Sequence, residues 1–228
     1  MLFIIFPILG VILTNLIGIT ILKSYIDNRL LFRKEYNEVL FYITFFNCFS
    51  WLIYGIIRND IYIFLSVICS LISCFLFIQL LYKNMNSEKL FYIEIFSLVF
   101  IIYFLLLIII INFIPNLSNN LIENIVGITA IITSMMNNSS PMIILTKVIQ
   151  TKSNSLIYLP QALIGFINLS CWLVYGVTIK DYFQVISNVI SILFCFIQII
   201  IYYYIECNKY IECNKYIESN KITNELDI

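Results

Sequence analysis

The chain has 228 residues, of which 61% are hydrophobic and only 11% are charged, with 13 basic and 13 acidic side chains and no histidine. Soluble domains carry roughly 25% charged residues, so this composition excludes an ordinary soluble protein and leaves no room for a soluble catalytic domain. We therefore expect an integral membrane protein surrounded by the lipid bilayer, with no nucleic-acid partner.

Seven apolar runs, separated by short polar connectors, follow one another along the chain. Each has about the 20 residues that a helix needs to cross a bilayer. They lie at 2–22, 38–57, 61–82, 92–114, 120–146, 156–178 and 182–205. The polar stretch 137–140 interrupts the fifth run just before Pro141. The first run has neither a basic residue ahead of it nor a small-residue cleavage pattern after it, so we interpret it as a retained helix and not as a signal peptide.

Basic residues gather in the connectors at one end of these predicted helices. Arg58 and Lys180 lie at the other end, whereas the remaining 11 of the 13 lysines and arginines lie in the connectors 23–34, 83–89 and 147–152 and in the tail after 205. Cytoplasmic loops accumulate positive residues. The pattern predicts an N-terminus outside and a C-terminus in the cytoplasm, and we favour the plasma membrane as the location.

The two halves of the chain repeat one another at an offset of 121 residues. Between 47–82 and 168–203, 12 of 36 ungapped positions are identical, and the two tryptophans of the chain, Trp51 and Trp172, align. A single helix separates the two three-helix units, so both units enter the membrane in the same sense. The predicted fold is an all-α membrane protein with seven transmembrane helices, arranged as two parallel three-helix bundles joined by a linking helix.

This repeat also predicts the division of the chain. We expect the first three-helix repeat at 1–90, the linker helix at 91–118 and the second repeat at 119–205, followed by a low-complexity cytosolic tail at 206–228. The tail repeats the hexapeptide Tyr-Ile-Glu-Cys-Asn-Lys. Six residues match neither the helical period nor a heptad, so we expect the tail to be mostly disordered.

Two related segments carry a resemblance to a known family. The first reads Asn47-Cys48-x-x-Trp51-x-x-Tyr54-Gly55 followed by Asp60, and the second reads Asn168-x-x-x-Trp172-x-x-Tyr175-Gly176 followed by Asp181 and Asn188. Gly127, Ser140-Pro141 and Leu159-Pro160 extend the pattern upstream. In these residues and in its repeat the chain resembles the SWEET sugar transporters, in which parallel repeats enclose a substrate site near the midplane. The resemblance covers about residues 40–82 and 125–204.

The resemblance implies facilitative, bidirectional uniport of mono- or small sugars by alternating access. It places the substrate beside Asn188 and Trp172, and we add Trp51, Ser66 and Ser70 as candidate substrate-binding residues. An amide offers both a donor and acceptors to sugar hydroxyls, and an indole face covers the apolar side of a pyranose. Two indoles narrow the expected pocket, which favours a hexose over a disaccharide. The repeat equivalent of Asn188 is Val67, which cannot form a side-chain hydrogen bond.

The resemblance also implies gating residues and positions of helix packing or bending. Those of the gate are Tyr54, Asp181, Tyr175, Pro141 and Pro160, and the packing or hinge positions are Gly55, Gly127 and Gly176. In the family pattern Tyr54 reaches Asp181 across the repeats, although each aspartate is equally placed to cap the helix that follows it. The equivalents of the two prolines in the first half are Thr20 and Val39, so we expect the two halves to bend unequally.

Alternatives remain on the sequence alone. No ionisable residue lies in the middle of the third or seventh predicted helix, which favours a carrier that is not coupled to protons or sodium. No cofactor and no metal are expected, and the lack of histidine and of a nucleophile–base pair argues against an enzyme. Pro160-Gln161 hints at a PQ-loop transporter of amino acids or other small solutes, and a seven-helix receptor or scaffold is less favoured. A homo-oligomer stays open.

Overall fold

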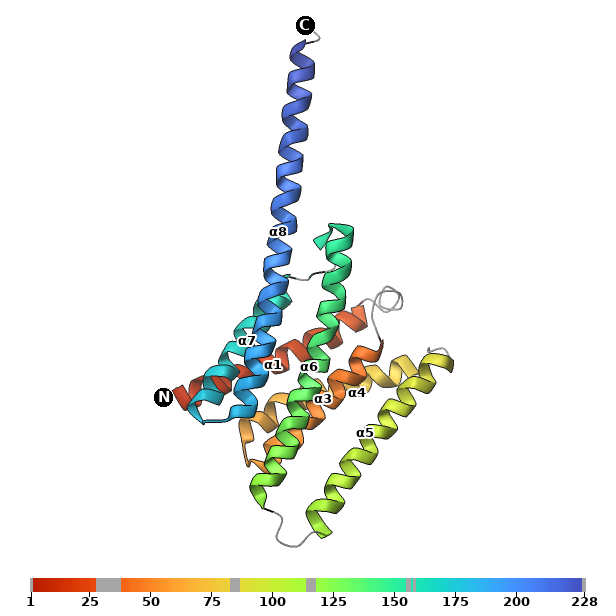
Figure 1. The fold of residues 1–228 in the computed structure, drawn as a ribbon, viewed down its shortest axis with the longest axis vertical. Helices are drawn as coiled ribbons and strands as arrows, with labels where there is room; N and C mark the ends of the chain where they lie inside the picture. Colours follow the sequence, from red (N-terminus) through yellow and green to blue (C-terminus); the bar gives the residue numbers. More distant parts are fainter. Residues whose placement is uncertain are drawn as a thin grey trace.

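The structure is a computed structural model that describes residues 2–27, 38–82, 87–113, 118–154, 157 and 159–226. In that part of the chain it consists of the helices α1 (Leu2–Asp27), α3 (Glu38–Ile57), α4 (Ile61–Tyr82), α5 (Ser87–Phe113), α6 (Asn119–Thr151), α7 (Leu159–Thr178) and α8 (Tyr182–Leu226), shown in Figure 1. Each predicted apolar run lies on one of these helices, and α6 continues through its polar stretch 137–140. The basic residues Arg29, Arg33, Lys34 and Lys83 lie outside the described residues.

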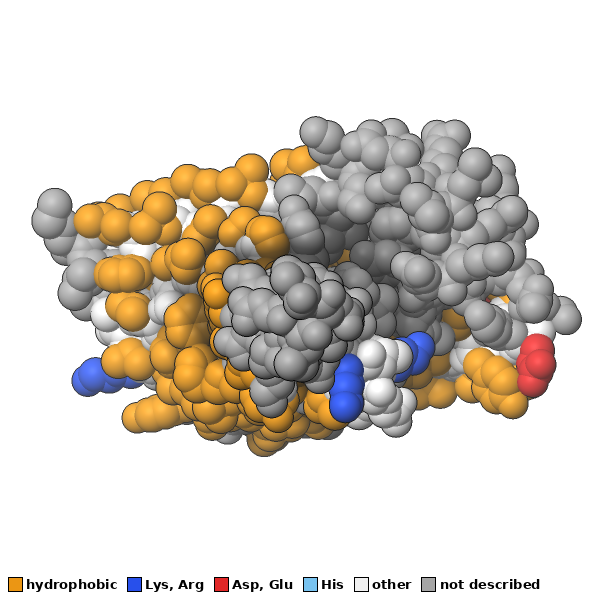
Figure 2. All heavy atoms as spheres, turned by 90° about the horizontal axis from the view of Figure 1, so that it is seen from above, with side chains coloured by type: hydrophobic (Ala, Val, Ile, Leu, Met, Phe, Trp, Pro, Cys, Tyr) orange, Lys and Arg blue, Asp and Glu red, His pale blue; other side chains and the backbone are white. Residues whose placement is uncertain are grey.

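Apolar side chains cover the outer faces of the helices. Along α1 and α5, for example, Ile12, Leu16, Leu98 and Leu105 are each about half exposed, and Figure 2 shows an almost continuous apolar surface on one face. Among the described side chains, Leu159–Thr178 and the stretch Tyr182–Ile211 are long and apolar enough to cross a membrane, and shorter apolar stretches lie in α1, α3, α4 and α5. Exposed apolar surface of this extent is typical of a lipid-facing protein.

Six of the described helices form a closed ring. In a first group α4 contacts both α1 and α3, and in a second group α8 contacts both α6 and α7. Contacts of α1 with α7 and of α3 with α6 join the two groups. The third helix therefore occupies the middle of each group, as expected if the two groups share one internal arrangement.

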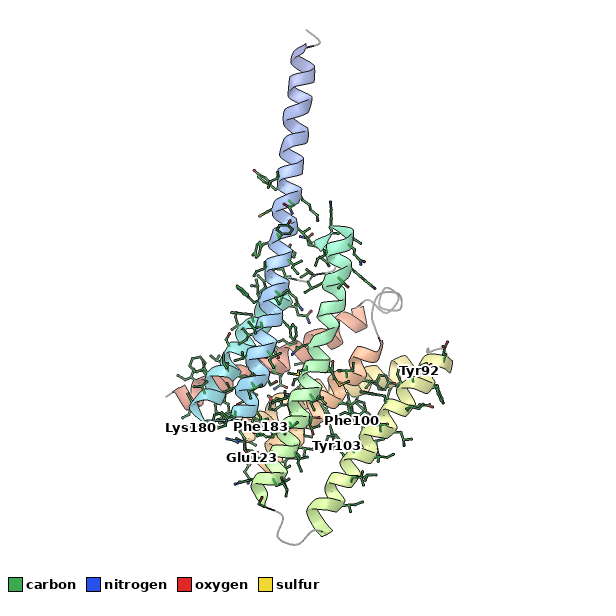
Figure 3. The ribbon with its side chains drawn as sticks, viewed as in Figure 1. Tyr92, Phe100, Tyr103, Glu123, Lys180 and Phe183 are labelled. Atoms are coloured by element: carbon green, nitrogen blue, oxygen red, sulfur yellow. The ribbon has the colours of Figure 1, made fainter. Side chains whose placement is uncertain are left out.

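Helix α5 lies outside this ring, against α3. The ring centroids of Phe100 on α5 and Phe46 on α3 lie 4.0 Å apart, and Phe49 meets Phe104 edge to face. The Tyr103 hydroxyl forms a hydrogen bond with Thr129 of α6, and Figure 3 labels Phe100 and Tyr103 on α5. Aromatic packing thus attaches this single helix to the outside of the ring.

The turns that join α3 to α4 and α7 to α8 have the same local structure. Asn59 and Lys180, which are equivalent in the repeat, both adopt left-handed backbone angles with φ of 55° and 57°. The Asp60 N–H donates to the Gly55 carbonyl at 2.9 Å, and the Asp181 N–H donates to the Gly176 carbonyl at 2.8 Å. The two aspartates then cap the next helix through their side chains. The sequence repeat is therefore a repeat of backbone geometry as well.

The C-terminal segment differs from its expected disorder, because α8 continues as a helix to Leu226. The segment after 203 contains neither proline nor glycine, and each hexapeptide places a glutamate three residues before a lysine. That spacing puts opposite charges on adjacent turns of a helix and stabilises it. At the start of the segment Asn154 donates to Glu206 at 2.6 Å and accepts from Lys209 at 2.6 Å. The six-residue period alone was therefore a poor guide to this segment.

We expect epitope tags to report the orientation inferred from the basic residues. A C-terminal tag should become accessible to antibody only after the cells are permeabilised, whereas an N-terminal tag should be accessible in intact cells. The physical reason is the excess of lysine and arginine in the connectors at the C-terminal side of the membrane. Labelling of the C-terminal tag in intact cells would contradict this orientation.

Candidate functional site

A cavity of about 180 Å³ lies inside the ring, and all six helices of the ring line it. None of the described lining side chains is charged, and most of the polar ones are amides and hydroxyls. Four of the five predicted substrate-binding residues line it: Asn188, Trp172, Trp51 and Ser66. Ser70 does not; it packs against Gly18 of α1, where an added Cβ would lie 2.8 Å from the Ser70 hydroxyl. The cavity is thus a neutral, hydrogen-bonding compartment between the two groups.

Two equivalent helices form unlike walls of this cavity. Asn188 on α8 is 8% exposed, and its Nδ2 donates to the Gln184 carbonyl one turn earlier at 2.8 Å. That bond stays within α8 and leaves the amide oxygen of Asn188 as an acceptor. The equivalent position on α4 is Val67, which is also buried and lines the cavity. Hydrogen bonding is therefore concentrated on the α8 side.

A chain of hydrogen bonds connects Trp51 to the second group. Its indole Nε1 donates to the Ser134 hydroxyl of α6 at 2.9 Å, and that hydroxyl donates to Asn47 Oδ1 at 2.8 Å. An indole N–H can only donate, so the Ser134 hydroxyl accepts this bond and keeps its own proton for Asn47. Asn47 consequently presents its oxygen to Ser134, and its NH₂ group remains for other partners.

The same chain occurs around Trp172 with the groups exchanged. The indole Nε1 of Trp172 donates to the Thr14 hydroxyl of α1 at 3.1 Å, and Thr14 donates to Asn168 Oδ1 at 3.1 Å. Sequence reasoning missed Thr14 and Ser134, because they are offset by 120 residues and not by the 121 that aligns the other helices. The two chains join the groups on both sides of the cavity and hold each indole in place.

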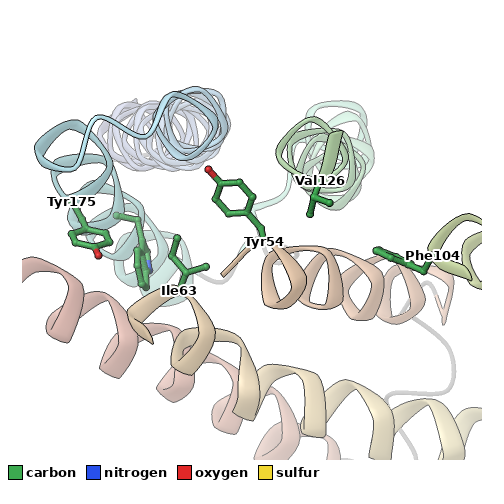
Figure 4. Packing of buried hydrophobic residues seen from close by; sticks show 6 residues of the cluster. Tyr54, Ile63, Phe104, Val126 and Tyr175 are labelled. Carbon is green, nitrogen blue, oxygen red and sulfur yellow. The ribbon is translucent and has the colours of Figure 1, made fainter. Parts of the chain in front are cut away.

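Two reciprocal hydrogen bonds between the groups lie beyond one end of the cavity lining, and we call them the closure. The Tyr54 hydroxyl donates to Asp181 Oδ1 at 2.9 Å, and the equivalent Tyr175 hydroxyl donates to Asp60 Oδ2 at 2.7 Å. Tyr54, Tyr175 and Trp172 belong to one buried cluster with Ile63, shown in Figure 4. Because both aspartates also cap helices, capping and contact across the groups coexist in the same side chains.

Arg58 adds charge to this closure. Its guanidinium forms an ion pair with Glu123 of α6 and lies with Nε 3.4 Å from Asp181 Oδ2. Asp181 is fully buried, and burial raises the pKa of its carboxyl above the usual range, whereas Gln184 N–H, Arg58 and Tyr54 lower it. The position equivalent to Arg58 in the second group is Ile179. The cation is therefore specific to one side of an otherwise symmetrical closure, and sequence analysis used Arg58 only to infer the orientation in the membrane.

Comparisons with known proteins agree with this arrangement. The family described as "Sugar efflux transporter for intercellular exchange" matches residues 124–210, which comprise most of the second group. The curated bidirectional sugar transporter SWEET7b and the putative bidirectional sugar transporter SWEET7d of Oryza sativa subsp. japonica are each 35% identical over 77 residues, or 34% of this chain. The matched part spans only 29% and 28% of their respective lengths.

Two further likenesses extend over more of the chain. Bidirectional sugar transporter SWEET7 of Arabidopsis thaliana is 25% identical over 176 residues, which are 74% of this chain and 67% of that protein. The solved structure described as "The 3.7 A resolution structure of a eukaryotic SWEET transporter" has a TM-score of 0.75 at 15% identity, covering 91% of this chain and 100% of that one. That likeness concerns the fold. The chain is thus similar to SWEET transporters in the sequence of its second group, and it shares the fold of a solved one.

The structural likeness confirms the predicted all-α membrane fold of seven helices, and the sequence likenesses agree with the resemblance to SWEET transporters. The relatives named above are sugar transporters, in agreement with the prediction of a transporter and not an enzyme. Pro7, which the offset of 121 did not single out, lies inside α1 and is fully buried. Pro160 is the second residue of α7, and Pro141 lies within α6, where its side chain is outside the described part.

The three glycines assigned to packing lie where neighbouring helices approach closely. A Cβ at Gly127 would lie 2.6 Å from the ring of Phe183 on α8, and one at Gly55 would lie 3.0 Å from the Phe64 backbone nitrogen. At Gly176 the nearest atom would be Gln184 Oε1 at 3.2 Å. Larger side chains at Gly127 and Gly55 would force neighbouring helices apart.

Proposed function

We propose that this protein is a facilitative, bidirectional uniporter of monosaccharides, with a hexose favoured, and that it works by alternating access in the plasma membrane. The observation that carries the proposal is the uncharged cavity between the two groups, lined by amides, hydroxyls and two indoles. Sugars present hydroxyls that both donate and accept hydrogen bonds, and amides and hydroxyls match them in both roles. The apolar faces of a pyranose match the indoles of Trp51 and Trp172.

The size of the cavity supports a single sugar ring. Its volume of about 180 Å³ lies below the roughly 300–1,000 Å³ of pockets that enclose drug-sized ligands. One pyranose is closer to this scale than two linked rings. The proposed substrate is therefore a monosaccharide.

The chemistry of the lining argues against the alternative of an amino-acid carrier. A zwitterionic amino acid carries two charges, and burying charges is costly unless charged or strongly polar partners compensate them. No carboxylate, lysine or arginine occurs among the described lining residues. Arg58, Glu123 and Asp181 belong instead to the closure at one end. A neutral, polyhydroxylated substrate fits the lining better.

We expect purified protein in proteoliposomes to exchange labelled hexose against unlabelled hexose and to leave labelled amino acids outside. We also expect uptake to stop at equal concentrations inside and outside and to be insensitive to an imposed proton gradient, because coupled carriers need ionisable groups within the membrane. Exchange of amino acids without exchange of hexoses would contradict the substrate class. Uphill accumulation that a protonophore abolishes would contradict uniport.

A further inference from the structure

The side chain of Gln184 is a buried amide whose oxygen has no hydrogen-bond partner in the described part of the chain. Gln184 is 3% exposed and lines the cavity, and its Oε1 has no hydrogen-bond partner among the described residues. Its backbone is fully used, because the N–H donates to Asp181 and the carbonyl accepts from Asn188. Buried polar atoms in native proteins are nearly always paired, and an unpaired one calls for an explanation in strain, in function or in a bound water or ion.

Packing alone does not explain a glutamine at this position. Gly176 leaves the space for the side chain, since an added Cβ would lie 3.2 Å from Gln184 Oε1 and 3.3 Å from Gln184 Cβ. In the first group the equivalent glycine, Gly55, makes the same contact with Ile63, where the distances are 3.2 and 3.3 Å. An isoleucine therefore fills the equivalent site without a polar atom. The amide at 184 adds hydrogen-bonding capacity that the fold does not need.

The position of Gln184 links it to Asn188. The two residues are four apart on α8 and so lie on one face of that helix, one turn from each other. Their equivalents on α4 are Ile63 and Val67, and all four side chains line the cavity. The α8 wall is consequently a pair of amides, and the α4 wall at the same level is a pair of branched aliphatic side chains.

We propose that Gln184 is a second substrate-binding amide, which with Asn188 binds adjacent hydroxyls of the sugar while Ile63 and Val67 contact its ring carbons. The inference rests on the proposed sugar transport and adds the orientation of the substrate to it. A primary amide can either donate or accept a hydrogen bond. Rotation of the Gln184 amide therefore lets it pair with a sugar hydroxyl that acts as acceptor or as donor. A sugar hydroxyl bound there would pair with the Gln184 amide, whose Oε1 has no hydrogen-bond partner among the described residues.

The test replaces Gln184 by the residue of its repeat equivalent. Gln184→Ile should raise the KM for hexose exchange about tenfold, the effect of losing one buried hydrogen bond, with membrane expression unchanged. Without added sugar, Gln184→Ile should melt at the same temperature as the wild type or higher, because an unpaired buried amide has been removed. The rise in melting temperature on adding hexose should shrink.

Matched controls separate binding from packing. Gln198→Ile makes the same change on α8 outside the cavity lining and should leave the KM unaltered. Gln184→Met keeps the length of the side chain without its amide and should repeat the result of Gln184→Ile. A set of monodeoxy hexoses should contain one analogue that the wild type transports poorly, and Gln184→Ile should no longer distinguish it from the parent hexose.

Two results would overturn the inference. One is an unchanged KM and an unchanged ranking of deoxy sugars in Gln184→Ile and Gln184→Met. The other is a lower melting temperature of both empty variants with normal sugar-induced stabilisation, which would make Gln184 a packing residue. Both presuppose hexose exchange by the wild type. Its absence would instead refute the proposed sugar transport, and this inference with it.

Discussion

Asn188→Ala is expected to remove most hexose uptake while leaving folding and membrane insertion intact. Loss of a partner from a buried site that binds a hydroxyl costs about 1–3 kcal/mol, which is roughly tenfold or more in affinity. The side chain makes its one hydrogen bond within α8, to the Gln184 carbonyl. No bond from Asn188 to another helix occurs in the described part, so its removal should not separate helices.

The matched variant for Asn188 lies at its repeat equivalent. Val67→Ala removes a side chain of similar burial from the α4 wall but no hydrogen bond, so uptake should fall less. Trp172→Phe retains an aromatic face and loses the donor to Thr14, and it should impair transport to an intermediate extent. The measurement is hexose uptake normalised to the amount of each variant in the membrane. Normal uptake by Asn188→Ala would show that this asparagine does not bind the substrate.

Arg58→Gln is expected to shift the protein towards a state in which the closed end of the cavity is open. Asp181 is fully buried and has Arg58 as its neighbouring cation. Removing one member of a buried ion pair costs roughly 3–5 kcal/mol, and we expect less here because the Arg58 side chain is 23% exposed. Opening would return Asp181 to water, so the loss falls on the closed state alone.

Cys48 lines the cavity and provides a native reporter of this opening. A membrane-impermeant thiol reagent applied from the side of the closure should label Cys48 faster in Arg58→Gln than in the wild type, with Cys48→Ser as the blank. Glu123→Gln breaks the more exposed ion pair and leaves Arg58 beside Asp181, so its labelling rate should rise less. Equal rates in wild type and Arg58→Gln would show that the arginine does not hold the closure.

The sequence allowed the membrane helices to be located because each one is a long apolar run bounded by polar connectors. It also aligned the two tryptophans, the Tyr-Gly pairs and the aspartates, since identical residues at one offset are visible without a structure. The reciprocal pair Tyr175–Asp60 follows from that repeat once Tyr54–Asp181 is accepted. These features depend on the order of residues along the chain, and so they can be identified from the amino-acid sequence alone.

The lining of the cavity was harder to predict. A helix that is apolar all round gives no periodic signal of which face points inward, so Ser70 was assigned to the site although it packs on Gly18. Thr14 and Ser134 were hidden by a one-residue change of offset between their helices. Gln184 was passed over because its equivalent, Ile63, is apolar. Each of these misses concerns the rotation of a helix about its axis or a residue present in only one half.

The difference between the two walls of the cavity affects how a sugar would move across the membrane. If the two walls were identical, a bound sugar would form hydrogen bonds to both three-helix groups. Some of those bonds would break whenever the two groups move apart. Here Gln184 and Asn188 belong to the second group, the second body of such a movement. Ile63 and Val67 line the cavity from the first group, the first body. Under the proposed transport, the sugar would keep its hydrogen bonds to the second body at this level, and the first body would offer only apolar contacts there.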